Sequence, residues 1–243
     1  MSIEEHVTLT IAGLTVAVVR KDIKNLHLGV YPPDGRVRVA VPLAVSDAAV
    51  HAAVAGKLGW IRRQRMAFVA QDRQSEREMV DGESHFYLGQ RYRLVVLPVA
   101  AKPKVRVAAR HMLELHVPPD FDRGEREQVL QNWYRSRLQE MLPPLLEKWQ
   151  TVLGVRVAFW GLKRMKTKWG SCNSAAGRVW FNAELAKKPP ECLEYLVAHE
   201  LAHLRVSTHD ERFTALLDHH VPGWRTTRDR LNAAPLAHED WRD

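Results

Sequence analysis

The chain has 243 residues, 46% of them apolar and 26% charged, which is the ordinary composition of a well-packed globular protein of one or two domains. Its two cysteines, Cys172 and Cys192, exclude a disulfide framework and fit neither a zinc ribbon nor a CxxC redox pair, so we expect a reducing compartment, the cytoplasm. The N-terminus lacks the basic and apolar regions of a secretion signal, and no eighteen apolar residues occur together, so we expect neither secretion nor a membrane span.

Lysine and arginine exceed the acids, which gives a formal net charge of +8 and a pI of about 9.7. The basic residues cluster at 57–65, 163–168 and 225–230. Such clusters are usually solvated surface. Alternatively, these basic clusters associate weakly with the phosphates of nucleic acid.

Residues 1–120 predict a strand-rich module with one helix. Apolar residues alternate with period two near the N-terminus, and the turn residues at 32–35 predict a hairpin. A helix is expected from Ser46, a favourable N-cap, to about residue 71. Alternation returns between residues 85 and 118, and no internal repeat is evident.

Residues 121–243 predict a second domain that mixes helices and strands. It opens with a long helix, bent near Pro143–Pro144 and closed by Gly154 as its C-cap. Two short strands joined by a loop follow, and then more helices. The expected fold class is therefore α+β, with a strand-rich module before a mixed domain.

The segment after residue 191 carries the strongest chemical signal, the pattern His-Glu-x-x-His. On a helix, His199 and His203 lie one turn apart on one face and can share a metal ion. Apolar residues on the opposite side supply the stripe that packs on the core. Glu200 lies too far round the helix to be a ligand but near enough to take a proton from a water on the metal. The alternative is a core helix whose histidines bond to neighbouring carbonyls.

A catalytic zinc needs a third protein ligand and an open fourth position. His209 is the preferred third ligand, because residues 206–208 are weak helix formers and predict a break after His203. Thr208 with Glu211 predicts a capping box that places His209 at the start of a new helix. The other candidates downstream are Asp210, Glu211, Asp218, His219 and His220.

The spacing H-E-x-x-H-x5-H is that of metzincins, but two metzincin features are missing. Val206 stands where metzincins have a glycine, and no methionine follows Met165. The chain more closely resembles the YgjP-like metallopeptidase family, relatives of the SprT-like proteases. The resemblance rests on TKWGSC (167–172), VWFNAEL (179–185), YLVAHELAHLRVSTHDERF (195–213) and VPGWRTTRDRL (221–231), with VAVP (39–42) and GWIRRQR (59–65) nearer the N-terminus.

This resemblance covers most of the chain and implies a zincin-like core. It implies one catalytic Zn2+ held by His199, His203 and His209, with Glu200 as the catalytic base. Thr214 departs from the family, which usually has an aromatic residue at this position. That departure bears on packing more than on metal ligation.

The stretch KWGSC precedes the histidine helix and offers a substrate-binding strand. Trp169, Gly170 and Ser171 would border the cleft and pair with an extended substrate, as edge strands do in zincins. The structural alternative is that Trp169 packs in the core and Gly170 makes a turn. Cys172 has no role in a three-histidine site.

These signals favour a zinc-dependent metallopeptidase that hydrolyses peptide bonds of a polypeptide substrate with a metal-activated water and Glu200 as general base. One alternative is a nucleic-acid-associated protein with a structural zinc, although such a site usually has a fourth ligand and cysteines. Two others are a protease acting on DNA-associated proteins and a metal-dependent amidase for a small molecule.

Overall fold

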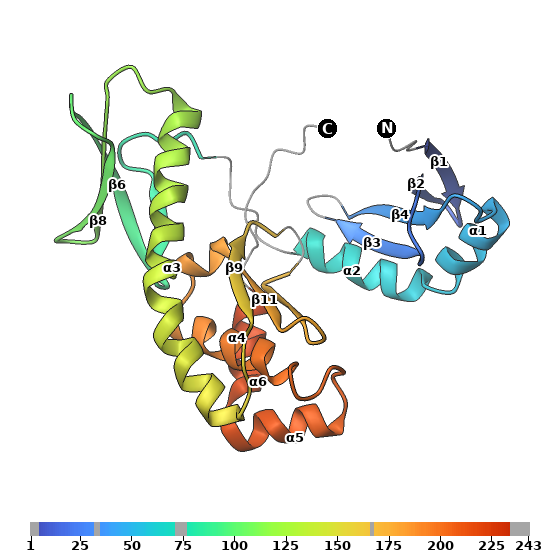
Figure 1. Cartoon of the computed structure of the whole chain (residues 1–243). Coiled ribbons are helices and arrows are strands. Elements are labelled where there is room, and N and C mark those ends of the chain that lie inside the picture. Colours follow the sequence, from blue (N-terminus) through green and yellow to red (C-terminus); the bar gives the residue numbers. More distant parts are fainter. Residues whose placement is uncertain (1–4, 32–34, 71–76, 166–167, 234–243) are drawn as a thin grey trace. The chain divides into compact units, whose positions relative to one another are not determined.

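The structure, a computed structural model, describes residues 5–31, 35–70, 77–165 and 168–233 (Figure 1). Two compact units make up the chain, one within Met1–Gln74 and one within Ser75–Glu239. The expected boundary near residue 120 falls inside the second unit. None of the helices in the described ranges is long and apolar enough to cross a membrane.

The first unit is a four-stranded sheet with two helices. Its strands lie in the order β1-β2-β4-β3. The hairpin expected around residues 32–35 joins β3 to β4, with Tyr31 opposite Arg36; its residues 32–34 lie outside the described ranges. The elements are β1 (Glu5–Ile11), β2 (Leu14–Lys21), β3 (His27–Tyr31), β4 (Arg36–Pro42), α1 (Asp47–Ala55) and α2 (Leu58–Ala70).

The helix expected from Ser46 begins there but is two helices rather than one. The hydroxyl of Ser46 accepts a hydrogen bond from the amide of Ala49, which confirms the N-cap. The first helix ends at its C-cap Gly56, a residue that is a poor helix former. The second helix contributes Ile61, which is fully buried, to the core of this unit.

The second unit opens with another four-stranded sheet, in the order β5-β6-β8-β7, and a long helix. The helix α3 (Arg123–Leu153) continues through Pro143 and Pro144, where a bend was expected. Gly154 ends it in the left-handed conformation with φ 61°. A capping box between Asp122 and Glu125 starts it. The strands are β5 (Ser84–Tyr87), β6 (Gln90–Pro98), β7 (Lys104–Ala108) and β8 (Met112–Val117).

The two sheets repeat one another, which corrects the expectation that the chain has no internal repeat. Both contain a hairpin, a parallel pair and a second hairpin in the same order. The turns Ala12–Gly13 and Leu88–Gly89 have positive φ at both residues, as a tight hairpin turn requires. The sequences differ, so the repeat is visible in the backbone and not in residue identities.

The same link also joins the last strand of each repeated sheet to the helix that follows it. The residue before each N-cap donates its amide to the carbonyl of a proline. Each residue of this link in the second unit lies 76 positions after its counterpart in the first. The pairs are Pro42 and Pro118, Val45 and Phe121, and Ser46 and Asp122.

The rest of the second unit is a small sheet and a group of helices packed on α3. The strand order is β10-β11-β9, so β10 is an edge strand. Leucines along α3 share one hydrophobic core with this sheet and with α4. The elements are β9 (Phe159–Lys163), β10 (Gly170–Asn173), β11 (Arg178–Asn182), the 3-10 helix η1 (Ala183–Lys187), α4 (Pro190–Ala202), α5 (Glu211–His220) and α6 (Trp224–Ala233).

The hairpin between β5 and β6 anchors the segment that leads into α4. The amides of Leu88 and Gly89 donate to the carbonyls of Ala186 and Lys187. A Cβ on Gly89 would lie 2.7 Å from the ring of Pro189, so only glycine fits this approach. The start of the histidine helix is thereby fixed to the second sheet.

Candidate metal centre

The histidine helix α4 is held rigidly by the core. Pro190 occupies its first turn, where a missing N–H costs nothing. Leu193, Val197 and Leu201 on its apolar side are almost fully buried. His199 and Glu200 are carried by the last turns of this helix, so the backbone that positions them cannot easily move.

The chain breaks after α4, as expected, but its next helix starts later than expected. The helix ends at Ala202 with His203 as its C-cap. The N-cap of α5 is Asp210, whose carboxylate accepts from the amides of Arg212 and Phe213; the hydroxyl of Thr208 donates to Asp210 instead of capping. The expected capping box at Thr208 is therefore wrong, because Asp210 is an equally good N-cap two residues on. His209 lies before the cap rather than after it.

The break brings three imidazoles together. The Nε2 atom of His209 lies 3.1 Å from Nε2 of His199 and 3.1 Å from Nε2 of His203. One ligand atom from each of the three residues lies within 4.8 Å of the others. For comparison, two nitrogens bound to one tetrahedral zinc at the usual bond length lie about 3.3 Å apart.

The second nitrogens of two rings have fixed partners. Nδ1 of His203 lies 3.2 Å from the carbonyl of Val206, and since a carbonyl only accepts, this nitrogen carries the proton and Nε2 presents a lone pair. Nδ1 of His199 lies 3.2 Å from the hydroxyl of Tyr195, one turn earlier on the helix. Such outer partners fix the ring orientation and tautomer of histidines that bind metals.

The electrostatic surroundings favour the uncharged form of two of the three imidazoles. Burial and, after it, the charges that the neighbouring imidazoles would carry lower the pKa of His199 to about 3. Burial also lowers the pKa of His203. At neutral pH these rings are unprotonated, which is the form that binds a metal ion.

An apolar wall lies against the three rings. The ring of Phe213 is 4.5 Å from that of His203 in a stacked arrangement and about 5 Å from those of His199 and His209. Phe213 is almost fully buried. It restricts how the three rings can rotate.

Glu200 lies next to the cluster and is buried. Only 5% of its surface is exposed. Burial raises the pKa of its carboxyl to about 8, while Lys168 acts in the opposite direction. Gly170 of β10 faces it, since a Cβ on this glycine would lie 2.5 Å from Oε1 of Glu200. A carboxyl with a raised pKa beside a metal-ligand cluster is the arrangement expected of a proton-transfer group.

Comparison with known proteins gives a family for this chain. The family model "YgjP-like, metallopeptidase domain" matches residues 24–234. The chain belongs to the YgjP-like family. It is a metallopeptidase family, so a metal-dependent hydrolase and a polypeptide substrate class follow from membership.

Two further comparisons add little to this YgjP-like assignment. No curated protein matches the chain. A solved structure, the metallopeptidase zymogen abylysin of Pyrococcus abyssi, is 24% identical, covers 36% of this chain and 89% of its own, and superposes with a TM-score of 0.34. At that score the similarity does not bear on the fold.

The segment beside Glu200 contains the three residues expected to bind substrate. Gly170 and Ser171 lie in β10 and are half-buried. Trp169 precedes the strand and is 8% exposed, so its side chain packs in the core, with the ammonium group of Lys188 5.2 Å from the ring centroid. The side chain of Trp169 therefore has the structural role, packing in the core, and does not border the substrate. The backbone of β10 lies at the edge of its sheet.

One residue that the sequence analysis missed holds this strand in place. Asn182 of the YgjP-like chain is fully buried at the end of β11. Its side-chain amide donates to the carbonyls of Met165 and Lys168, at 2.7 and 2.8 Å, and its backbone amide donates to the carbonyl of Trp169. Its side-chain oxygen accepts from the amide of Glu184. The asparagine within VWFNAEL was the available signal, but only the fold shows that its partners lie in the loop before β10.

Proposed function

We propose that this chain is a zinc-dependent metallopeptidase with one catalytic Zn2+ ligated by His199, His203 and His209. The observation that supports this most strongly is the convergence of three Nε2 atoms beside a buried glutamate. Neutral imidazoles suit a borderline-soft ion such as zinc. The spacing of the nitrogens and the fixed outer partners of two rings fit this ion.

The number of ligands favours a catalytic over a structural ion. Structural zinc sites have four protein ligands, whereas catalytic sites have three and keep one position open. Among the described residues, the group that can hold a metal contains three histidines and no cysteine or carboxylate. The nucleic-acid-associated alternative with a structural zinc therefore lacks its fourth ligand.

Glu200 would act as the general base. Zinc, when bound, lowers the pKa of a water toward about 7 and polarises the scissile carbonyl. Glu200 then takes a proton from the attacking water and passes it to the leaving amine. Burial already makes the neutral form of this carboxyl accessible near pH 7, and a positive charge nearby would favour the carboxylate. A group that shifts between both forms near neutral pH suits this two-step transfer.

The substrate would lie along β10. This strand is at the edge of its sheet, packs against α4, and has Gly170 directly beside Glu200. An extended polypeptide can pair with such an edge through backbone hydrogen bonds. We assign substrate contact to the backbone of Gly170 and Ser171, and an anchoring role to Trp169, whose side chain is buried.

The remaining proposals concern organisation and compartment. We propose that the zincin-like catalytic core lies within residues 121–243; of the strand-rich residues 1–120 before it, those from Ser75 on belong to the same compact unit as this core. We also propose that the chain acts in the cytoplasm, a reducing compartment that suits its two free cysteines.

The proposal can be tested on the purified full chain with an unstructured protein as substrate. We expect about one zinc ion per chain, cleavage that a chelator abolishes, and recovery of cleavage when zinc is restored. Salt-dependent binding to DNA without cleavage of any polypeptide would instead favour the nucleic-acid alternative.

A further inference from the structure

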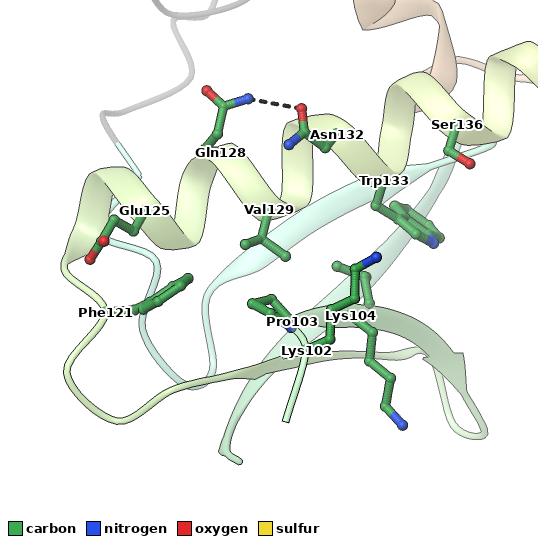
Figure 2. Close-up of a pocket in the computed structure, with 11 residues that line it drawn as sticks. Lys102, Pro103, Lys104, Phe121, Glu125, Gln128, Val129, Asn132, Trp133 and Ser136 are labelled. Carbon is green, nitrogen blue, oxygen red and sulfur yellow. Dashed lines mark hydrogen bonds between the residues drawn. The ribbon is translucent and has the colours of Figure 1, made fainter. Parts of the chain in front are cut away.

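A groove lies between β7 and α3, at a place that the proposed catalytic site does not use. Its volume is about 730 Å³. Figure 2 shows Val129 and Trp133 directed from α3 toward the strands, with Phe121 at one end. The residues that line it are Lys102, Pro103, Lys104, Val105, Phe121, Glu125, Gln128, Val129, Asn132, Trp133 and Ser136.

The groove combines an apolar floor with a basic strand side. Val105, Phe121, Val129 and Trp133 are half-buried and pack on the main core. Lys102 and Lys104 are exposed, and no ion pair or hydrogen bond within the described ranges engages either ammonium group.

The single acid of the groove is already engaged. Glu125 accepts a hydrogen bond from the backbone amide of Asp122 in the capping box that starts α3. A ligand in the groove therefore meets apolar side chains and excess positive charge.

The strand beside the groove can accept another strand. β7 is the last strand in the order β5-β6-β8-β7, so one row of its backbone N–H and C=O groups lacks a partner strand among the described residues. Val107, two residues after Val105 on the same face, is 45% exposed. The apolar stripe of the groove thus continues along the edge of the sheet, and exposed apolar edges are typical of sites where a chain adds as a strand.

In the first unit, the equivalent position of the repeat is covered. Val30 occupies the position in β3 that Val107 occupies in β7, since each is the penultimate residue of its strand and pairs with the second residue of the next. Yet Val30 is only 6% exposed. In the first unit, α2 packs against β3, and Val30 lies in one buried cluster with Ile61 of α2.

In the second unit the corresponding helix takes a different course. α3 continues as one helix through the position where α1 ends at Gly56, and the residue 76 positions after Ile61 is Arg137. The same architecture therefore buries the penultimate residue of its edge strand in one unit and leaves it exposed in the other.

We propose that this groove is an exosite, which binds an extended segment of the polypeptide substrate away from the bond that is cut. The segment would add to β7 as a strand, place apolar side chains against Val105 and Val107, and place acidic side chains near Lys102 and Lys104. This inference rests on the proposed peptidase function only in that the bound segment belongs to the substrate. That the groove binds an extended acidic peptide is argued from its shape and charge alone.

Binding can be measured in the Glu200→Gln variant of the full chain, which keeps the probe uncut. The probes are two fluorescent peptides of about 12 residues, long enough to span about 40 Å when extended. Both carry the same alternating leucines and valines, with glutamates between them in one peptide and lysines in the other. Fluorescence anisotropy gives the Kd of each.

The variants separate shape from charge, and each has a matched control. Val107→Asn should weaken binding of the acidic peptide about fivefold or more, whereas Val152→Asn, at a valine of α3 that is 40% exposed, should not change it. Lys102→Glu with Lys104→Glu should weaken binding of the acidic peptide and strengthen binding of the lysine peptide. Arg156→Glu with Arg178→Glu makes the same charge change at exposed positions elsewhere and should affect neither.

The outcomes decide the exosite independently of catalysis. An acidic peptide that binds with the same Kd to the groove variants and to their controls would overturn the proposal, and so would a preference for the lysine peptide. A free protein that dimerises, and stops dimerising in Val107→Asn, would show that a second copy covers this face instead. If the groove variants lose peptide binding but the wild-type chain cuts no polypeptide, the exosite stands as a peptide site and the peptidase function is wrong.

Discussion

Gly170 and Glu200 are in direct contact, since a methyl group on Gly170 would lie 2.5 Å from Oε1 and 2.8 Å from Cδ of Glu200. The carboxylate cannot swing away cheaply, because Glu200 is 5% exposed. The position next to the glutamate thus requires a residue without a side chain.

We therefore expect Gly170→Ala to lower kcat about a hundredfold, because a displacement of the base by about 1 Å is enough for such a loss. Zinc content should stay the same, since the three atoms nearest to the added methyl group all belong to Glu200 and none to a histidine. Gly59→Ala adds the same methyl group where the nearest atom is 3.7 Å away, and it should leave kcat unchanged. An unaltered kcat in Gly170→Ala would mean that Glu200 does not need its present position.

Asn182→Ala is expected to raise KM while leaving zinc content intact. The variant leaves the carbonyls of Met165 and Lys168 without their donor, which should destabilise the protein by about 2–3 kcal/mol and loosen the start of β10. Leu130→Ala in α3 is a suitable control, because it removes a buried side chain at a similar cost but far along the chain from this strand. Equal KM values in the two variants would make Asn182 a residue of stability alone.

Tyr195→Phe should weaken zinc binding about tenfold, because His199 loses the partner of its Nδ1 atom. Competition with a chelator of known affinity measures this change. Tyr134→Phe deletes another buried hydroxyl, which donates to the carbonyl of Phe86, and it should leave zinc affinity unaltered. If both variants bind zinc like the wild type, the tyrosine is not an outer partner of the centre.

The metal-free protein should lose stability as the pH rises, through Glu200. The unfolded state releases the proton near the ordinary pKa of 4.5, while the folded state keeps it until about pH 8. Stability from this group is therefore complete below pH 4.5 and falls between pH 4.5 and 8. The upper limit of the loss is about 5 kcal/mol.

Urea unfolding of the metal-free wild type and of Glu200→Gln at several pH values isolates this effect. The difference in unfolding free energy should shift in favour of the glutamine variant as the pH rises, and then level off above pH 8. A constant difference across this range would show that Glu200 ionises normally in the folded chain.

Local signals in the sequence predicted the elements whose residues are neighbours along the chain. Ser46 begins a helix, Gly154 ends one, and the weak helix formers after His203 mark a real break. Each of these depends on backbone hydrogen bonds made within a few residues. The same reasoning misplaced the start of α5, because Thr208 and Asp210 are both good N-caps and only the three-dimensional path selects between them.

Features that depend on distant partners could not be predicted in this way. The 76-residue repeat is carried by backbone conformation and strand pairing, so unlike sequences conceal it. The role of Asn182 depends on a loop 14 to 17 residues away in sequence, and the contact of Gly170 with Glu200 joins a strand to a helix. The helical spacing places His199 near His203, and the expected break made His209 the preferred third ligand, but the distances from its ring to the other two come only from the folded turn.

The measurement that bears most directly on the central claim compares Glu200→Gln and His199→Ala with the wild type, in zinc content and in cleavage of an unstructured protein. The glutamine variant should bind about one zinc ion per chain, as the wild type does, and its turnover should fall by at least about a thousandfold, because the ligands remain and the proton acceptor is gone. The alanine variant should lose both zinc and cleavage. Normal turnover by a zinc-loaded Glu200→Gln protein would contradict the account.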